Sequence, residues 1–199
     1  MDILRAIDNN SQKPLEDFNN MDNANDLNEL FGELTDKYGD SVYKFCRSIT
    51  YSKEDADDLF QETFLKIFEQ PHKICGADNQ QSFIFSAALY IWKSEKRKYA
   101  RRRRIAPVEP LELHETAADG GINNIEDNFI LQEELRLVRG LVEALPEKFK
   151  VPVIMFYNSD MSVPEIAAAL KLPDGTVKSR LFKARKIIEK GLGAFNYER

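Results

Sequence analysis

Apolar residues recur at intervals of three and four along most of this chain, and almost no stretch shows the alternation typical of a β-strand. The clearest run of this kind comprises Leu27, Leu30, Phe31, Leu34, Tyr38, Val42, Phe45 and Ile49. Six further helices are expected, over residues 53–70, 81–103, 129–145, 147–158, 162–170 and 174–191. This spacing predicts an all-α protein.

Breaks in the helical pattern indicate two domains. Residues 105–127 contain two prolines and two adjacent glycines without periodicity, which is typical of a flexible linker. Residues 1–26 are polar and are expected to form a flexible N-terminal arm. The chain is therefore predicted to fold as two small helical domains, residues 27–104 and 128–199, with a loop at 71–80 in the first.

Charge is segregated along the chain, although the net value is only −5. Residues 71–104 carry 9 basic and 2 acidic side chains, and residues 146–199 carry 10 and 6. The segments between and before them are acidic. Two basic blocks separated by acidic ones favour two surfaces that bind a polyanion such as nucleic acid.

The segment from Ser162 to Leu181 has the form of a helix-turn-helix, like a winged helix without its strands. Ser162 is a helix cap, and Pro164 stands in the first turn, where proline is tolerated. In the second helix, one stripe is apolar: Val177, Leu181, Ala184 and Ile188. The opposite face contains Ser179, Phe182, Lys183, Lys186 and Lys190. A phenylalanine among lysines suits contact with thymine methyl groups in a major groove.

Two helices of the first domain carry faces of opposite charge. Helix 81–103 is expected to place Tyr90, Lys93, Ser94, Arg97 and Arg101 on one face, which suits stacking on exposed bases and contact with phosphates. Its inward stripe is expected to contain Ile84, Ala88, Ile91, Trp92 and Tyr99. On helix 53–70, Asp55, Asp58, Glu62 and Glu69 form an acidic face flanked by Leu65. This face would repel DNA and favours a basic protein partner.

No residue pattern indicates catalysis, a metal site or a cofactor. His72 and His114 lack partners at metal-ligand spacing, and no glycine-rich phosphate loop or nucleophile motif is present. The densest apolar run, residues 83–92, is half a bilayer span, so no membrane insertion is expected. Without an apparent export signal, Cys46 and Cys75 favour a reduced, cytoplasmic protein.

The stretch Asp55–Leu65 resembles the polymerase-binding helix of bacterial extracytoplasmic-function (ECF) sigma factors. Residues 145–150 and 162–185 resemble the promoter-reading helix-turn-helix of the same family, and the order of the segments also matches. The resemblance implies that Asp58, Leu59, Gln61, Glu62 and Leu65 bind a coiled coil of the largest subunit of core RNA polymerase. It makes residues 27–104 the region-two domain and residues 128–199 the region-four domain.

The same resemblance implies a role in promoter DNA recognition for both domains. The loop near Lys73–Gln81 would hold a base flipped from the melted −10 element, and residues Tyr90 to Arg101 would contact that element. The −35 element would be read by Thr176, Lys178, Ser179, Phe182, Lys183 and Lys186. The family also implies an anti-sigma factor as a partner.

Other classes of protein explain less of the sequence. A helix-turn-helix regulator that acts without polymerase would account for residues 146–191 but not for the charged faces of 53–103. An RNA-binding protein would account for Arg101–Arg104 alone. An enzyme would need the catalytic residues that the sequence does not offer.

Overall fold

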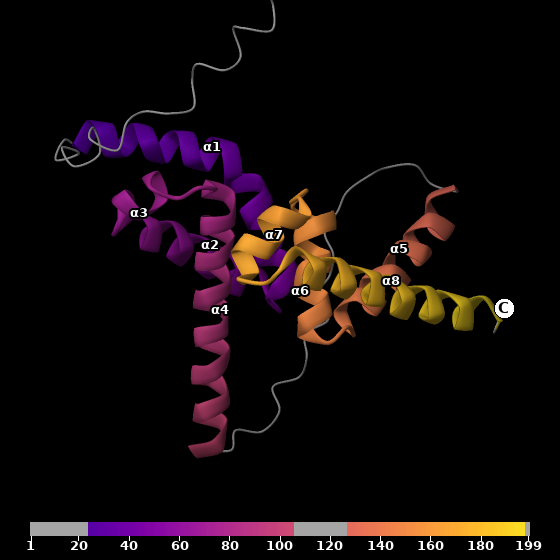
Figure 1. The fold of residues 1–199 in the computed structure, drawn as a ribbon. Helices are drawn as coiled ribbons and strands as arrows, with labels where there is room; N and C mark the ends of the chain where they lie inside the picture. Colours follow the sequence, from indigo (N-terminus) through magenta and orange to yellow (C-terminus); the bar gives the residue numbers. More distant parts are fainter. Residues whose placement is uncertain (1–23, 106–126, 198–199) are drawn as a thin grey trace, which may run out of the picture.

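The computed structural model describes residues 24–105 and 127–197, and all regular structure in these two segments is helical (Figure 1). The eight helices are α1 (Ala24–Ile49), α2 (Lys53–Phe68), α3 (Pro71–Cys75), α4 (Gln80–Ile105), α5 (Asp127–Glu143), α6 (Glu147–Tyr157), α7 (Val163–Leu170) and α8 (Asp174–Tyr197). The all-α prediction is confirmed.

Local sequence signals set where the helices begin. The Ser52 hydroxyl accepts a hydrogen bond from the Asp55 amide at 3.0 Å and starts α2. At α7, Ser162 and Glu165 form a reciprocal capping box, with Pro164 in the first turn. The loop expected at 71–80 is partly wrong, because Pro71 is tolerated in the first turn of a helix and opens the short α3.

The predicted N-terminal arm and linker fall largely on residues outside the described segments. Residues 24–26, which were assigned to the arm, already belong to α1. The last helix extends to Tyr197, six residues beyond its expected end, because no proline or positive-φ residue interrupts it.

Helices α1 to α4 form the N-terminal helical unit around one apolar core. Phe45 of α1 and Phe85 of α4 are fully buried, and their ring centroids lie 5.0 Å apart. Ile67 of α2 and Ile74 of α3 complete this core. Burial of these side chains is the main source of the stability of the unit.

Helices α5 to α8 form the C-terminal helical unit. Met155 of α6, Ile166 of α7 and Val177 of α8 are fully buried, and Leu181 is 2% exposed. Between α7 and α8, Lys171 adopts the left-handed conformation (φ 54°, ψ 50°), which ends α7. Pro173 then accepts the first amide hydrogen bonds of α8. The unit is therefore a helix-turn-helix built on α7 and α8, with α6 beneath.

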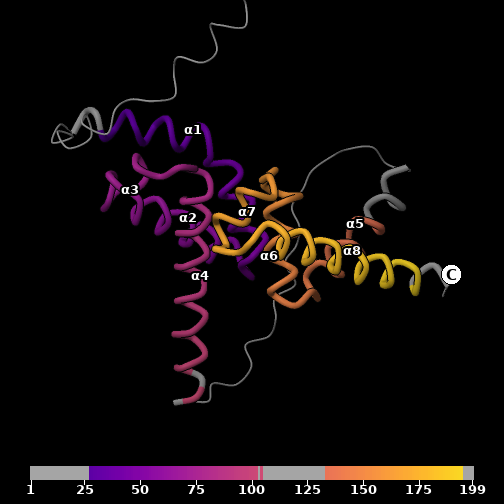
Figure 2. Tube along the Cα trace, viewed as in Figure 1, coloured from indigo at the N-terminus to yellow at the C-terminus, as the bar shows by residue number. Residues whose placement is uncertain are grey.

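The two helical units are in direct contact, an arrangement that the sequence did not predict. Helix α7 packs on the first half of α4, and α6 packs on α1 (Figure 2). The second half of α4 projects away from both units (Figure 1).

Candidate polymerase and promoter surfaces

Helix α2 presents an acidic face to solvent. Asp58, Gln61 and Glu62 are exposed, and Leu65 is 60% exposed in line with them. Leu65 therefore lies at the surface, where a partner protein can contact it, rather than in the core. Leu59, expected in the same set, is instead 5% exposed and packs in the core, so that assignment needs correction. We call Asp58, Gln61, Glu62 and Leu65 the acidic face.

Helix α4 carries the predicted basic face: Tyr90, Lys93, Ser94, Arg97 and Arg101. Tyr90 is 63% exposed, the three cations are exposed, and Ser94 is half-buried. The Arg97 Nε donates to the Lys93 carbonyl at 3.2 Å, which orients its guanidinium along the helix. A surface hollow of about 290 Å³ lies on this face, between Ser94 and Arg101. Another hollow, of about 380 Å³, lies away from this face and is lined by Phe156 and Tyr157.

The inward stripe predicted for α4 is wrong at Tyr99. This side chain is 59% exposed, because the second half of α4 extends beyond the helices that cover the first half (Figure 1). The neighbouring Lys98 donates to the Glu95 carboxylate at 2.6 Å, and this hydrogen bond raises the pKa of Lys98. The hydrogen bond thus favours the charged form of Lys98.

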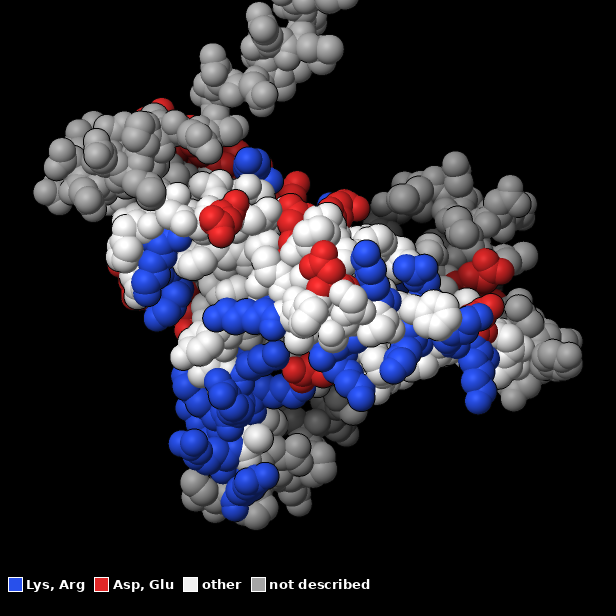
Figure 3. Space-filling view, viewed as in Figure 1, with Lys and Arg blue, Asp and Glu red and all other residues white. Residues whose placement is uncertain are grey.

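The first half of α8 carries the recognition face: Thr176, Lys178, Ser179, Phe182, Lys183 and Lys186. Phe182 is 60% exposed, whereas its neighbour Leu181 is buried, so the helix separates a core stripe from an exposed stripe, as the spacing predicted. All six are exposed except Thr176, which is half-buried and accepts a hydrogen bond from Ser179 at 2.9 Å. Lysines and arginines gather on the projecting half of α4 and along α8 in one view of the molecule (Figure 3).

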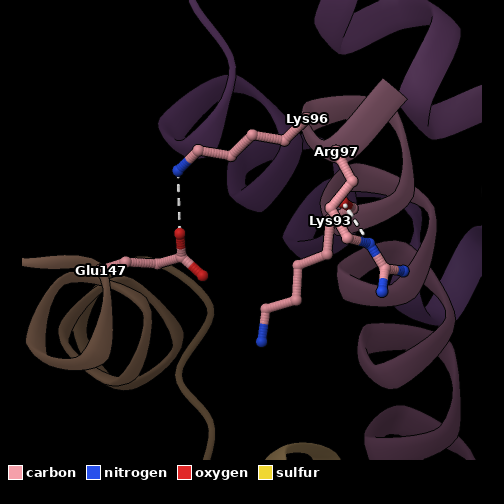
Figure 4. Close-up of polar contacts among 4 residues, drawn as sticks. All are labelled: Lys93, Lys96, Arg97 and Glu147. Carbon is pink, nitrogen blue, oxygen red and sulfur yellow. Dashed lines mark hydrogen bonds and ion pairs between the residues drawn. The ribbon is translucent and has the colours of Figure 1, made fainter. Parts of the chain in front are cut away.

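Sequence reasoning missed the polar contacts that join the two helical units. Asn79 donates to the Glu165 carboxylate at 3.2 Å, and the Ser82 hydroxyl donates to the Glu165 carbonyl at 2.9 Å. Farther along α4, the Lys96 ammonium reaches across to the Glu147 carboxylate at 2.8 Å (Figure 4). The capping motif of Ser162 and Glu165 was readable in the sequence, but nothing there indicated its partner 86 residues away.

Hydrogen bonds from Ser162, and a further one from Asn79, hold the pKa of Glu165 below its usual range. Glu165 is therefore ionised at neutral pH, and its charge strengthens each of these contacts.

The described residues offer no metal centre. They contain no group of three or more histidines, cysteines or acids able to hold a metal ion. Burial raises the pKa of Cys46 to about 12, so this thiol is no nucleophile at neutral pH. Within the same residues, no helix combines the length and apolar character needed to cross a membrane.

Comparison with known families matches both helical units. Residues 34–103 match sigma-70 region 2, and residues 135–188 match sigma-70 region 4. A regulator that had only the helix-turn-helix would lack the first of these matches.

Relatives of the same class cover most of the chain. The ECF RNA polymerase sigma factor SigW of Bacillus subtilis is 25% identical over 169 residues, which cover 82% of this chain and 89% of SigW. The ECF RNA polymerase sigma-E factor of Escherichia coli K12 is 30% identical over 138 residues, covering 68% of this chain and 72% of the relative.

Solved structures share the fold. One is the sigma factor RpoE of Bartonella quintana, solved in complex with the anti-sigma factor NepR. It superposes on this chain with a TM-score of 0.64 at 21% identity, and the match covers 83% of this chain and 97% of the RpoE chain. CnrH, in complex with the cytosolic domain of CnrY, has a TM-score of 0.56 at 20% identity, with coverages of 84% and 90%. The two sigma-70 matches and the full-length relatives together establish that this chain belongs to the ECF family of RNA polymerase sigma factors, non-enzymatic proteins that direct transcription initiation.

Proposed function

We propose that each of the three faces makes one contact in transcription initiation. The acidic face binds core RNA polymerase, the basic face binds the −10 element, and the recognition face binds the −35 element. The observation that carries this proposal is their chemistry: each is exposed, each lies on a different helix, and each combines charge with an exposed apolar group. Leu65 supplies that group on the acidic face, Tyr90 on the basic face and Phe182 on the recognition face.

The acidic face docks on the largest-subunit coiled coil of core RNA polymerase. Its carboxylates would attract a basic partner surface and keep DNA away, and Leu65 would anchor the contact in an apolar site. In this assignment residues 27–104 form the polymerase-binding and −10-binding domain, and residues 128–199 form the −35-binding domain.

The two basic surfaces capture the promoter. Helix α8 enters the major groove of the −35 element, where Phe182 contacts thymine methyl groups and the lysines contact bases and phosphates. The basic face of α4 and the segment Lys73–Gln81 hold the non-template strand of the −10 element as it opens. Stacking on Tyr90 and capture of a flipped base would replace the stacking that melting removes.

Run-off transcription with bacterial core RNA polymerase and promoter DNA from the source genome tests this assignment. We expect transcripts only when the chain is present, and we expect Leu65→Ala to weaken binding to core polymerase by about tenfold. Tyr51→Ala is the matched control, since Tyr51 is 72% exposed but lies outside all three faces. Equal affinity for core polymerase in both variants would refute the assignment of the acidic face.

An anti-sigma factor is the partner that we propose for control. The supporting observation is that RpoE, which shares this fold, was solved in complex with the anti-sigma factor NepR, and CnrH in complex with the cytosolic domain of CnrY. Native purification from the source bacterium, with transcription assayed before and after the bound partner is removed, tests this. Transcription should rise on removal, and equal transcription in both samples would contradict the proposal.

A further inference from the structure

The contact between the two helical units lies at the N-termini of α4 and α7. One side chain caps each N-terminus, and the two capping side chains also contact each other. The Asn79 Oδ1 accepts the Ser82 amide at 2.7 Å at the start of α4. The Glu165 Oε2 accepts the Ser162 amide at 2.8 Å and its hydroxyl at 2.7 Å at the start of α7. Each capping side chain therefore has one polar atom left for the other unit.

Those two remaining atoms are paired. The Asn79 Nδ2 donates to the Glu165 Oε1 at 3.2 Å, and the Ser82 hydroxyl donates to the Glu165 carbonyl at 2.9 Å. Because the acceptor is a carboxylate, the first contact is charge-assisted. The contact therefore needs one donor and one acceptor. An amide donor stands at residue 79 and a carboxylate acceptor at residue 165, and an acceptor at residue 79 with a donor at residue 165 would fit equally well.

Other contacts between the units are also polar. Asn158 donates to Ser48 at 2.9 Å, and Lys96 pairs with Glu147 at 2.8 Å (Figure 4). The Lys96 and Glu147 side chains are 53% and 41% exposed, so this pair adds little by itself. The contact also has an apolar part, because the buried side chains of both units form one cluster and α7 packs directly on α4. The hydrogen bonds therefore supply its geometry and part of its stability.

The closed arrangement covers one end of the segment proposed to hold a flipped −10 base, at Asn79, whereas Lys73, Gly76 and Asp78 stay exposed. The Asn79 Oδ1 accepts the Ser82 amide, its Nδ2 donates to Glu165, and the adjoining Ser82 is only 5% exposed. While α7 stays in place, a base therefore competes with Glu165 and Ser82 for the Asn79 side chain.

Closure also conflicts with the spacing of a promoter. The two promoter elements lie roughly 85 Å apart along the duplex, at about 3.4 Å per base-pair step. The recognition face occupies residues 176–186 of α8, which follows α7 after a short turn and spans only about 15 Å along the helix axis. Thr176 follows Glu165, which contacts Asn79, by 11 residues, so even a fully extended chain would leave Lys186 no more than about 55 Å from the −10 segment. The recognition face is thus about 30 Å or more too close to the −10 segment.

We propose that Asn79 and Glu165 form a latch that holds the helix-turn-helix over the Asn79 end of the −10 segment and must open before both promoter elements are bound. The latch rests on the proposed function for its consequence, since it assumes that Lys73–Gln81 contacts the −10 element. Its existence as a contact that sets the distance between the units does not depend on that assumption.

Asn79→Asp breaks the latch with the least other change. Asparagine and aspartate are equally good caps, so Oδ1 still accepts the Ser82 amide. The other carboxylate oxygen replaces Nδ2 and faces Glu165 Oε1, where two negative charges repel. We expect this variant to shift the closed-to-open ratio by about tenfold or more toward open.

Glu165→Gln provides the reciprocal change. Glutamine also completes a capping box, with its carbonyl toward Ser162, but its amide then faces the Asn79 amide and two donors meet. We expect a shift of about threefold toward open. In the double variant, the glutamine amide introduced at position 165 donates to the aspartate carboxylate introduced at position 79. The closed population should then return to within about twofold of the original.

Fluorescence energy transfer within the full chain measures the closed population directly. Dyes on cysteines introduced at Asp36 and Gly193, which are both exposed, report the distance between units in a Cys75→Ser background. Cys46 is fully buried and will not label. Lower transfer in each single variant and recovery in the double variant supports the latch. Unchanged transfer in Asn79→Asp, or no recovery in the double variant, overturns it.

Run-off transcription on the same variants separates this inference from the proposed function. If no variant supports transcription with core polymerase, the proposed function fails while the transfer measurement still decides the latch. Ser82→Ala is the second test of closure, because it removes the other hydrogen bond to Glu165 without adding charge. It should also lower transfer, and an unchanged value would count against the latch.

Discussion

Replacing Phe182 by alanine is expected to weaken promoter binding while leaving the fold intact. About 60% of this side chain is exposed, so removing it leaves no cavity and should change the free energy of unfolding by no more than about 0.5 kcal/mol. A phenylalanine side chain has on the order of 200 Å² of surface, of which roughly 120 Å² would be covered by DNA. At about 25 cal/mol per Å², its contact with thymine methyl groups stabilises the complex by up to ~3 kcal/mol.

Leu181 supplies the contrasting substitution one residue away. It is 2% exposed in the core of the helix-turn-helix, and Leu181→Ala should lower the free energy of unfolding by about 2–5 kcal/mol. Ile187→Ala is the matched surface control, since Ile187 is 43% exposed on the same helix but outside the recognition face.

Two measurements on each variant separate the roles. Urea unfolding gives stability, and transcription titrated against promoter concentration gives the apparent affinity for the −35 element. We expect a loss of affinity of about 10- to 100-fold for Phe182→Ala only, with normal unfolding. If Phe182→Ala bound the promoter as well as Ile187→Ala, the assignment of α8 as the reading helix through this residue would be refuted.

Four further substitutions test packing, backbone conformation and burial. A Cβ at Gly191 would overlap the Leu141 side chain, so Gly191→Ala should lower the free energy of unfolding by about 1–2 kcal/mol. A Cβ at Gly193 would have no atom within 4 Å, so Gly193→Ala should raise the free energy of unfolding by about 0.5–1 kcal/mol, because alanine favours the helix. Changes of the same sign in urea unfolding would contradict this. Lys171→Gly should stabilise the turn by about 0.5–1 kcal/mol, because glycine adopts φ 54° without strain; a lower midpoint would contradict it. Burial raises the pKa of the Cys46 thiol to about 12 in the folded chain, whereas the thiol of the unfolded chain ionises near ~8.5. Below pH ~8.5 the thiol is neutral in both states, so its contribution to stability is complete. Above that pH the unfolded state loses the proton first, and the free energy of unfolding falls by up to about 1.4 kcal/mol per pH unit. Cys46→Ala should lack this part of the pH slope between pH 8 and 10, and equal slopes would contradict the burial argument.

Helix positions and the helix-turn-helix were predictable because each depends on local signals. Ser52 and Ser162 cap helices that start where the apolar period starts, and the stripe from Val177 to Ala184 is buried as its spacing requires. Phe182 was predicted to be exposed because that spacing left it on the opposite side, and the structure confirms it.

The errors arose where tertiary surroundings override the local period. Tyr99 continues the apolar stripe of α4, but no helix covers that part of α4, so the side chain is exposed (Figure 1). Leu59 was assigned to a binding face by family resemblance, whereas packing within the N-terminal helical unit buries it. In both cases burial was set by where neighbouring helices end, which a helical period does not encode.

The pairing of Asn79 with Glu165 was beyond local reasoning for a related cause. Each residue is fully explained as a cap of its own helix, so neither carries a signal that it has a second partner. The same double role lowers the free energy needed to separate the two units. When the units separate, Asn79 still accepts the Ser82 amide and Glu165 still accepts from Ser162, so no helix end loses its cap. Opening then requires exchange of the polar contacts for water, at roughly 0.5–1.5 kcal/mol each or up to about 3 where a charge is involved, and exposure of the apolar surface between α4 and α7. The closed form can therefore be specific in its geometry and still yield to the larger binding energy of polymerase and promoter.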